Sequence, residues 1–359
     1  MDKNQIIKPG ATIGVVGGGQ LAKMLCIEAV RLGYKTHVLS DRANDPGFKV
    51  ATFKTHAKYD DVEPIREFAK NVDLVTFEFE NIPAATIKAI EEETLVRPNA
   101  NALYVSQDRL REKAFLNENG IKTTNYAAIT EVSHLKENFE KFSQKAILKS
   151  SQFGYDGKGQ QVLNDKTNIS QIWKLSSIEC KKFILEERID FEKEISVVIA
   201  RGLDGKKRAY DPVENIHKNG ILRQTIAPAK VSAEISKQAI KIAETITDKL
   251  EYVGVLAVEF FVTKSGELLV NEYAPRPHNS GHWTIDGCYY NQFEQAVRAV
   301  CGLPLGNCKA HSQAKMFNLI GSEIQNTDDI LKHDNAKLHV YGKENTRKGR
   351  KMGHYTLVF

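Results

Sequence analysis

The feature that most constrains the fold is a regular alternation of buried strands and helices in the first hundred residues. Three stretches have the length and apolar composition of buried strands: residues 11–16, 35–39 and 73–77. Three others have the apolar spacing of helices: residues 21–32, 62–70 and 84–92. Strands that alternate with helices form an open parallel sheet with right-handed crossovers. We therefore expect a parallel α/β domain over residues 1–105.

The rest of the chain changes pattern twice. After a polar helix at 101–119, we expect a second unit with strands near Thr123 and at 146–149, 160–163 and 183–186, and helices at 134–142 and from Asn168. From Glu194 we expect long strands at 195–200, 207–210, 221–226, 255–262 and 268–273, helices at 232–250 and 291–300, and short strands from Lys315. These changes predict a linker helix with a small α+β domain at 106–190, a larger α+β domain at 191–310 and a β-rich segment at 311–359.

Composition excludes several classes of protein. The formal net charge of +5 on 359 residues mildly favours anionic ligands but is too small for a nucleic-acid-binding surface. The longest apolar stretch, residues 253–262, is interrupted by Glu259 and is too short to span a bilayer. The N-terminus has no apolar signal core, and the five cysteines form no CxxC pair. We expect a cytoplasmic enzyme with reduced cysteines that binds neither membranes nor nucleic acid.

A glycine-rich turn, Gly17-Gly18-Gly19-Gln20-Leu21-Ala22, stands between the first strand and the first helix. Read as G-x-G-x-x-A, with Asp41 after the second strand, it fits a dinucleotide-binding turn. Any strand-to-helix turn that presents backbone amides to a phosphate has a similar pattern. Three interpretations stay open: a nicotinamide or flavin cofactor, a tight turn without a ligand, and another phosphate-bearing ligand.

A second glycine-rich segment, residues 149–160, begins at Lys149, where an apolar strand ends. It has three glycines within six residues but no Gly-Lys-Ser/Thr, so it is not a Walker loop. Backbone amides of such a loop can close over phosphate oxygens, beside the Lys149 ammonium. We expect a lid over a nucleotide, with a solvated hairpin turn as the alternative. Glu186-Glu187-Arg188-Ile189 and Glu194 could then serve adenine and ribose, although alone they would be ordinary surface charges.

The hairpin 255–273 places two carboxylates together. A two-residue turn at Ser265-Gly266 would set Glu259 directly opposite Glu272 on one face, with Cβ atoms roughly 5 Å apart. Two adjacent carboxylates in an apolar strand pair repel each other and lose solvation. A Mg²⁺ ion between them would relieve both problems. The alternatives are a shared proton or an arginine partner, and a one-residue slip would separate the pair.

Directly after this pair stands a cluster of polar residues stiffened by two prolines, Arg276-Pro277-His278-Asn279-Ser280-Gly281-His282. Arg276 is placed to stabilise charge on a transferred phosphoryl group or an acyl phosphate. A lone histidine would be unremarkable, but a cluster beside a metal site is a catalytic candidate.

Together these motifs resemble the ATP-grasp ligases over nearly the whole chain, and most closely the 5-(carboxyamino)imidazole ribonucleotide synthetases of purine biosynthesis. The resemblance rests on five motifs in the family's order: 17–21 (GGGQL), 76–83 (TFEFENIP), 154–160 (GYDGKGQ), 276–282 (RPHNSGH) and 350–354 (RKMGH). It implies a Rossmann-like first domain, a lid domain and a catalytic domain. It also implies that ATP and bicarbonate form carboxyphosphate, which carboxylates the amine of 5-aminoimidazole ribonucleotide and releases ADP and phosphate.

The resemblance also implies roles for individual residues. The ATP site would comprise Arg109, Lys149, Gly154, Tyr155, Asp156, Gly157, Lys158, Gly159, Gln160, Glu186, Glu187, Arg188, Ile189, Glu194, His217, Asn271 and Glu272. The ribonucleotide would contact Gln20, Leu21, Glu78 or Glu80, Tyr155, Asp156, Lys158, Ser280, Lys343 and Arg350. Mg²⁺ would bind Glu259 and Glu272, and the catalytic residues would be Arg276, His278, Asn279, Asp156 and Lys158. A homodimer is expected on the same ground.

The sequence departs from the family at one position and leaves alternatives open. Many ATP-grasp enzymes have a metal-ligating Asn two residues after the second Glu, where this chain has Ala274; its Asn271 precedes that Glu. The alternatives are a formate-using glycinamide ribonucleotide transformylase, a biotin carboxylase, a nicotinamide-dependent oxidoreductase and a non-catalytic nucleotide-binding module.

Overall fold

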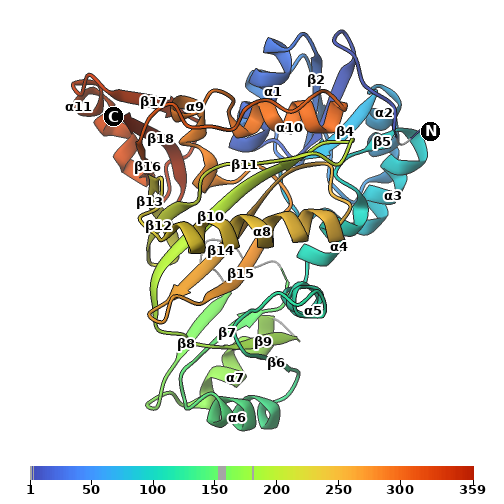
Figure 1. Ribbon diagram of the computed structural model, residues 1–359. Coiled ribbons are helices and arrows are strands. Elements are labelled where there is room, and N and C mark those ends of the chain that lie inside the picture. Colours follow the sequence, from blue (N-terminus) through green and yellow to red (C-terminus); the bar gives the residue numbers. More distant parts are fainter. Residues whose placement is uncertain (1, 3, 153–158, 180–181) are drawn as a thin grey trace.

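The computed structural model describes residues 2, 4–152, 159–179 and 182–359 (Figure 1). These residues form three β-sheets with helices packed on and between them, so the expected mixture of α/β and α+β architecture is confirmed. In the part of the chain that the structure describes, every helix is too short or too polar to cross a membrane.

The N-terminal domain is an open parallel sheet. Its strands are β1 (Thr12–Val16), β2 (Lys35–Ser40), β3 (Phe53–His56), β4 (Leu74–Phe77) and β5 (Leu95–Val96), in the order β3-β2-β1-β4-β5. Its helices are α1 (Gln20–Arg31), the 3-10 turn η1 (Pro46–Lys49), α2 (Val62–Lys70) and α3 (Ala84–Glu93). Every strand pair is parallel, as predicted. The edge strands β3 and β5 were not predicted, because β3 is largely exposed and β5 has two residues.

The connector consists of two helices, α4 (Ala100–Ser106) and α5 (Arg109–Glu118), so the single helix expected at 101–119 is wrong. The break falls at Asp108. Its side chain accepts the backbone N–H groups of Leu110 at 3.0 Å and Arg111 at 3.3 Å, which caps α5.

The second unit is a small antiparallel sheet, at the lower end of Figure 1. It contains β6 (Tyr126–Ile129), β7 (Ala146–Ser150), β8 (Gln160–Leu163) and β9 (Phe183–Glu187), in the order β6-β9-β7-β8, with helices α6 (Val132–Lys141) and α7 (Ile169–Glu179). The strand expected near Thr123 begins at Tyr126 instead, because Thr123 forms an isolated bridge with Val270 of the large sheet.

The large sheet has nine strands. They are β10 (Phe191–Arg201), β11 (Lys207–Ala209), β12 (Val213–Lys218), β13 (Ile221–Ala227), β14 (Gly254–Thr263), β15 (Leu268–Ala274), β16 (Ala314–Ile320), β17 (Ala336–Val340) and β18 (Lys351–Val358). Their order is β15-β14-β10-β12-β13-β16-β18-β17, with β11 paired to β10. The strands from 314 onward thus extend the sheet of the preceding domain. Strand β12 was not predicted, because its sequence lacks an apolar alternation: the polar Asn215 is buried, whereas the apolar Ile216 is exposed.

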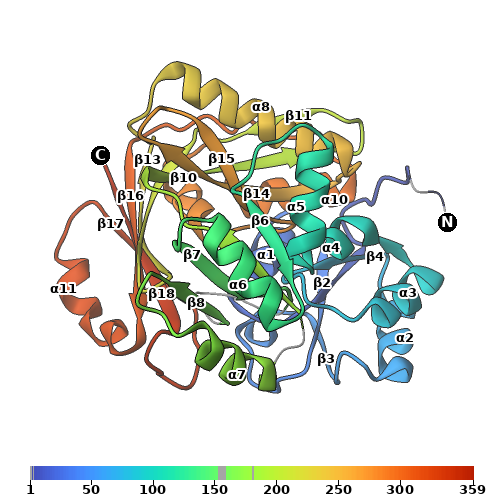
Figure 2. The same cartoon turned by 90° about the horizontal axis from the view of Figure 1, so that it is seen from below.

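Helices cover this sheet unequally. They are α8 (Ala233–Lys249), η2 (Asn279–Gly281), α9 (Thr284–Gly287), α10 (Gln292–Cys301), η3 (Gly321–Asn326) and α11 (Thr327–Leu331). Helix α8 packs on the apolar face that includes Ile195, Val197 and Ile199. The opposite face meets α10 and, through it, α1 of the N-terminal domain. Seen from below, α11 and α3 lie on opposite sides of the molecule (Figure 2).

The β14–β15 hairpin confirms the predicted pairing of Glu259 with Glu272, but for a different reason. Near the turn, Val262 pairs with Leu268, one residue away from the register that a two-residue turn would set. A bulge between Glu259 and Phe260 then takes up one extra residue on β15 and restores the predicted register beyond it. The two deviations cancel at the functional position.

Candidate active site

One face of the large sheet carries a row of polar side chains that crosses its strands. Glu272 of β15 lies directly opposite Glu259 of β14, and Glu259 lies directly opposite Ser196 of β10. The row continues on β12, β13, β16 and β18 with Asn215, Thr225, Asn318 and His354. Ser196 and Asn215, like Thr225 and Asn318, are offset by two residues from direct opposition, which keeps them on the same face of the sheet.

The two glutamates of the row are electrostatically unequal. Burial, followed by repulsion from Glu272, raises the pKa of Glu259 to about 7. Burial would also raise the pKa of Glu272, but Arg109 and Lys149 hold it at about 2. Arg109 Nη1 donates to Glu272 Oε2 at 2.7 Å, so the alternative of an arginine partner holds for this carboxylate.

The charge balance of this pair fits a divalent cation. Because burial and Glu272 raise the pKa of Glu259 to about 7, an added positive charge would stabilise its ionised form. Two carboxylates, completed by phosphate oxygens and water, are a common ligand set for Mg²⁺. Within the described ranges, no group of three or more His, Cys, Asp or Glu side chains is arranged to hold a metal elsewhere.

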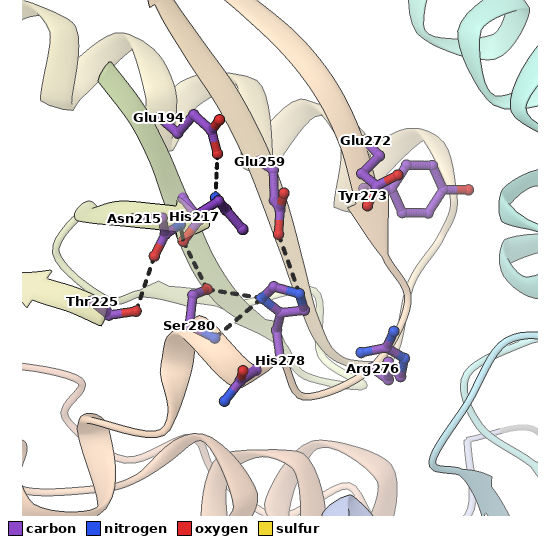
Figure 3. A network of polar contacts seen from close by, with 12 residues as sticks. Glu194, Asn215, His217, Thr225, Glu259, Glu272, Tyr273, Arg276, His278 and Ser280 are labelled. Carbon is purple, nitrogen blue, oxygen red and sulfur yellow. Dashed lines mark hydrogen bonds and ion pairs between the residues drawn. The ribbon is translucent and has the colours of Figure 1, made fainter. Parts of the chain in front are cut away.

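The segment 276–282 packs onto the polar row (Figure 3). His278 Nε2 lies 3.3 Å from Glu259 Oε1, and its Nδ1 lies 2.8 Å from Ser280 Oγ. Ser280 Oγ in turn accepts a hydrogen bond of 2.7 Å from Ser196 Oγ. The catalytic candidate is therefore connected both to the carboxylate pair and to the next strand of the sheet.

Amide side chains from outside this segment hold it in place. Asn279 and Asn318 exchange hydrogen bonds of 3.0 and 2.8 Å. Gln292 accepts from the backbone N–H of His278 at 2.9 Å and donates to its carbonyl at 2.7 Å. Asn279 is thus occupied by a structural contact that the sequence did not indicate.

Arg276 joins this segment to the N-terminal domain. Its Nε donates to Glu80 Oε2 at 2.6 Å and its Nη2 to Glu80 Oε1 at 3.3 Å, a bidentate pair. Burial opposes ionisation of Glu80, but Arg276 lowers its pKa below the usual range. The guanidinium is therefore held in one orientation beside the Glu259–Glu272 pair.

A second charged cluster lies where α5 meets the small sheet. Lys149 Nζ donates to Glu186 at 2.9 Å, and Lys113 Nζ lies 3.9 Å from the same oxygen. Lys113 is 1% exposed and also donates to the carbonyl of Asn271 at 2.9 Å. Because Arg109 and Lys113 lie one turn apart on α5, this helix directs two cations toward the strands that carry Glu272 and Glu186.

The N-terminal glycine turn is filled by the protein's own carboxylate. Glu78 accepts the backbone N–H of Gly19 at 2.7 Å and of Ala22 at 3.2 Å, at the start of α1. A Cβ atom on Gly17 would come within 2.3 Å of the Glu78 side chain, and one on Gly19 within 2.6 Å. The glycines therefore make room for Glu78, at the place where a dinucleotide would present its pyrophosphate.

Three family models match the chain: a ribonucleotide synthetase preATP-grasp domain at residues 10–107, an ATP-grasp domain at 114–293 and a phosphoribosylaminoimidazole carboxylase C-terminal domain at 314–359. The N5-carboxyaminoimidazole ribonucleotide synthase of Brucella melitensis is 45% identical over 358 residues, which are 100% of this chain and 99% of that protein. The chain belongs to the N5-carboxyaminoimidazole ribonucleotide synthase family. It is an ATP-dependent ligase of purine biosynthesis, and as an ATP-grasp enzyme it uses ATP with Mg²⁺.

Solved structures of this synthase family share the fold. The ADP complex of an N5-carboxyaminoimidazole ribonucleotide synthetase has a TM-score of 0.95 at 39% identity and covers 99% of this chain and 94% of its own. The synthase of Aspergillus clavatus, in complex with ADP and 5-aminoimidazole ribonucleotide, has a TM-score of 0.91 at 27% identity, covering 99% and 94%. A bifunctional purine synthesis protein of Dictyostelium discoideum is 44% identical over 371 residues, and this chain spans 37% of its length.

Several residues assigned to the ATP site by resemblance to the synthases lie near the Glu259–Glu272 pair or near Glu186. His217 pairs with Glu194, which raises the pKa of His217 although burial opposes it. Glu187 accepts from Asn125 at 2.7 Å, Arg188 is exposed and Ile189 is half-buried. Gly159 and Gln160 enter β8, whereas Gly154, Tyr155, Asp156, Gly157 and Lys158 lie outside the described residues. The nucleotide roles of all these residues stay predictions.

The residues predicted to contact the ribonucleotide come from both ends of the chain. Gln20 and Leu21 open α1, and Leu21 is buried in the core. Lys343 donates to the carbonyl of Lys351 at 2.8 Å, and Arg350 to that of Asn345 at 2.9 Å. The two ends are tied together by Lys23 and Lys49, which donate to carbonyls of residues 340–342.

Sequence reasoning missed several groups around the site, among them Glu112, Lys113, Ser196 and Asn215. Glu112 accepts the backbone N–H of Tyr273 at 2.7 Å, and burial raises its pKa to about 8. The spacing of Arg109 and Lys113 could have indicated a common helix face. Ser196 stands out only as a hydroxyl within an apolar strand, and Asn215 lies on the unpredicted strand β12.

Proposed function

We propose that this chain carboxylates 5-aminoimidazole ribonucleotide with bicarbonate and ATP, forming N5-carboxyaminoimidazole ribonucleotide, ADP and phosphate. The observation that carries the proposal is the Arg276–Glu80 pair, which brings the N-terminal domain into contact with the segment beside Glu259 and Glu272. The ribonucleotide bound by the Aspergillus clavatus relative supports the choice of substrate.

In this proposal, Glu259 and Glu272 hold Mg²⁺, which would neutralise charge on the phosphate oxygens when bound. Lys149 and Arg109 contribute positive charge on the nucleotide side, where they already pair with Glu186 and Glu272. Arg276 binds the anionic bicarbonate and the carboxyphosphate derived from it, because Glu80 orients its half-buried guanidinium next to the carboxylate pair.

The same proposal assigns the phosphate of the ribonucleotide to the cationic surface formed by Lys343 and Arg350. Lys23 and Lys49 lie at the same junction between the N-terminal domain and residues 340–342. Cations from two domains would close the substrate pocket at the end remote from the metal pair.

We also propose that the enzyme works as a homodimer in the cytoplasm. The dimer is proposed from the family resemblance alone, and sedimentation of the purified protein tests it. A reducing compartment is consistent with Cys26, Cys288, Cys301 and Cys308, which are free and buried.

A coupled assay of ADP release tests the reaction. Full turnover should require ATP, 5-aminoimidazole ribonucleotide and bicarbonate together, and omission of any one should reduce ADP release to background. Equal turnover with glycinamide ribonucleotide and formate would assign the chain to a different ligase reaction.

The variant Glu272→Gln tests the metal assignment. It should abolish turnover because it removes one ligand of the proposed Mg²⁺, while the far-ultraviolet circular dichroism spectrum stays that of the parent protein. Full activity in this variant would refute the metal pair.

A further inference from the structure

Behind His278, a line of hydrogen bonds runs through the polar row to Thr225 (Figure 3). Thr225 Oγ1 donates to Asn215 Oδ1 at 3.0 Å, and Asn215 Nδ2 donates to Ser196 Oγ at 2.8 Å. Ser196 Oγ donates to Ser280 Oγ at 2.7 Å, and Ser280 Oγ lies 2.8 Å from His278 Nδ1. Ser196 and Thr225 are fully buried and Asn215 is 5% exposed, so water does not compete for these groups.

All donors of this line point toward His278. The backbone N–H of Ser280 lies 3.3 Å from His278 Nδ1, and because a backbone N–H can only donate, Nδ1 must accept. The Ser280 hydroxyl already accepts from Ser196, which leaves its own proton for the same Nδ1. A neutral imidazole whose Nδ1 accepts carries its proton on Nε2.

The other neutral tautomer is disfavoured at Nδ1, because a proton there would face the backbone N–H of Ser280 at 3.3 Å. A doubly protonated ring is disfavoured by the same contact, because its Nδ1–H would also face the backbone N–H of Ser280.

We propose that Ser196, Asn215 and Thr225 are positioning residues that hold His278 as a neutral Nε2–H donor directed at the space beside Glu259. The proposal rests on the proposed function, because carboxyphosphate would form in that space. A fixed donor stabilises an anionic oxygen there without reorganising during the reaction. Without the line, the Ser280 hydroxyl can turn its proton toward Ser196, and the imidazole loses one of the two donors that orient it.

The tautomer is tested by nitrogen-15 NMR of the imidazole rings in the full-length enzyme without substrates, at neutral pH. His278→Gln identifies the His278 signals by their disappearance. The proposal predicts a protonated Nε2 and an unprotonated Nδ1 in the parent protein. A protonated Nδ1 would overturn it, whether or not the enzyme carboxylates the ribonucleotide, so this result is independent of the proposed reaction.

The positioning residues are tested by two variants with a matched control. Asn215→Asp keeps the shape of the side chain but removes its donor, and Thr225→Val removes the first hydroxyl. Thr247→Val is the control, because Thr247 is equally buried but donates to the Glu244 carbonyl within α8. In both test variants kcat should fall roughly 10-fold to 100-fold with an unchanged KM for ATP, and the Nε2–H signature should be lost or mixed.

The control should keep the parent kcat and the parent His278 spectrum. The proposal is overturned if Asn215→Asp and Thr225→Val behave like the control. A lower kcat with an unchanged His278 spectrum would also overturn it, because that result indicates a structural role only.

Discussion

At the scale of single residues, the pKa of each carboxylate in the site depends on whether an arginine lies beside it. Glu272 and Glu80 each have an arginine, Arg109 and Arg276, and their pKa values lie below the usual range. Among the described residues, Glu259 lies 3.3 Å from His278 Nε2, and burial raises its pKa to about 7. The unbalanced carboxylate is thus the one opposite Glu272, where the metal is proposed.

This imbalance predicts a pH-dependent stability. Because the folded-state pKa of Glu259 is raised, its contribution to stability is fully present below the unfolded pKa and is lost as pH rises through about 7. In EDTA, the Tm of the parent protein relative to Glu259→Gln should therefore fall between about pH 5 and pH 8. Differential scanning fluorimetry of both proteins at each pH measures this difference in Tm.

Added Mg²⁺ provides the control for this experiment. At the higher pH it should raise the Tm of the parent protein more than that of Glu259→Gln, because only the parent has both carboxylates. A Tm difference between the two proteins that stays constant across the pH range would contradict the account of Glu259.

At the scale of elements, the N-cap of α5 directly precedes Arg109, which is proposed to contribute positive charge at the ATP site. Asp108→Ala should lower the free energy of unfolding by about 1 kcal/mol and raise the KM for ATP, because Arg109 is the first residue of the helix that loses its cap. Urea unfolding and steady-state kinetics measure the two effects. Asp61→Ala is the control, because Asp61 precedes α2 without a capping hydrogen bond. Equal effects of both variants would contradict this role.

The β14–β15 hairpin shows which features the sequence pattern predicts and which it does not. Alternation within strands predicted that Glu259 and Glu272 share a face, and this is confirmed although the turn register was wrong. The bulge lies where β14 pairs with β10 and beside Val270, which forms a bridge with Thr123, and a local pattern contains neither contact.

Other parts of the site could not be predicted for a related reason. Ser196, Asn215 and Thr225 meet only because β12 and β13 pair beside β10, and β12 has no clear apolar alternation. Likewise, Glu80 and Arg276 lie 196 residues apart, and only the packing of two domains makes them partners. Local periodicity indicates faces of elements, whereas contacts between distant elements require the tertiary fold.

At the scale of the whole molecule, the candidate active site lies where the domains meet. The N-terminal domain contributes Glu80, the connector contributes Arg109 and the large sheet contributes Glu259 and Glu272. Lysines of α1 and η1 bind the backbone before β18 and tie the same domain to the C-terminal strands. The candidate site therefore combines residues from three parts of the chain.

This arrangement predicts that Glu80→Gln uncouples the domains at the site. Loss of the charge-assisted pair with Arg276 should cost roughly 1–3 kcal/mol of stability and lower kcat/KM for the ribonucleotide, with little change in the KM for ATP. Glu93→Gln is the control, because Glu93 pairs with Arg66 within the N-terminal domain, away from the site. An effect on the KM for ATP alone would contradict the domain coupling.

The most direct test of the proposed chemistry follows the oxygen atoms of bicarbonate. If bicarbonate attacks the terminal phosphate of ATP at the Arg276 and metal-pair site, one of its oxygens stays on phosphorus when carboxyphosphate breaks down. With oxygen-18-labelled bicarbonate, ATP and 5-aminoimidazole ribonucleotide, the account predicts that the released phosphate carries one labelled oxygen, measured by mass spectrometry. Unlabelled phosphate formed together with carboxylated product would contradict it.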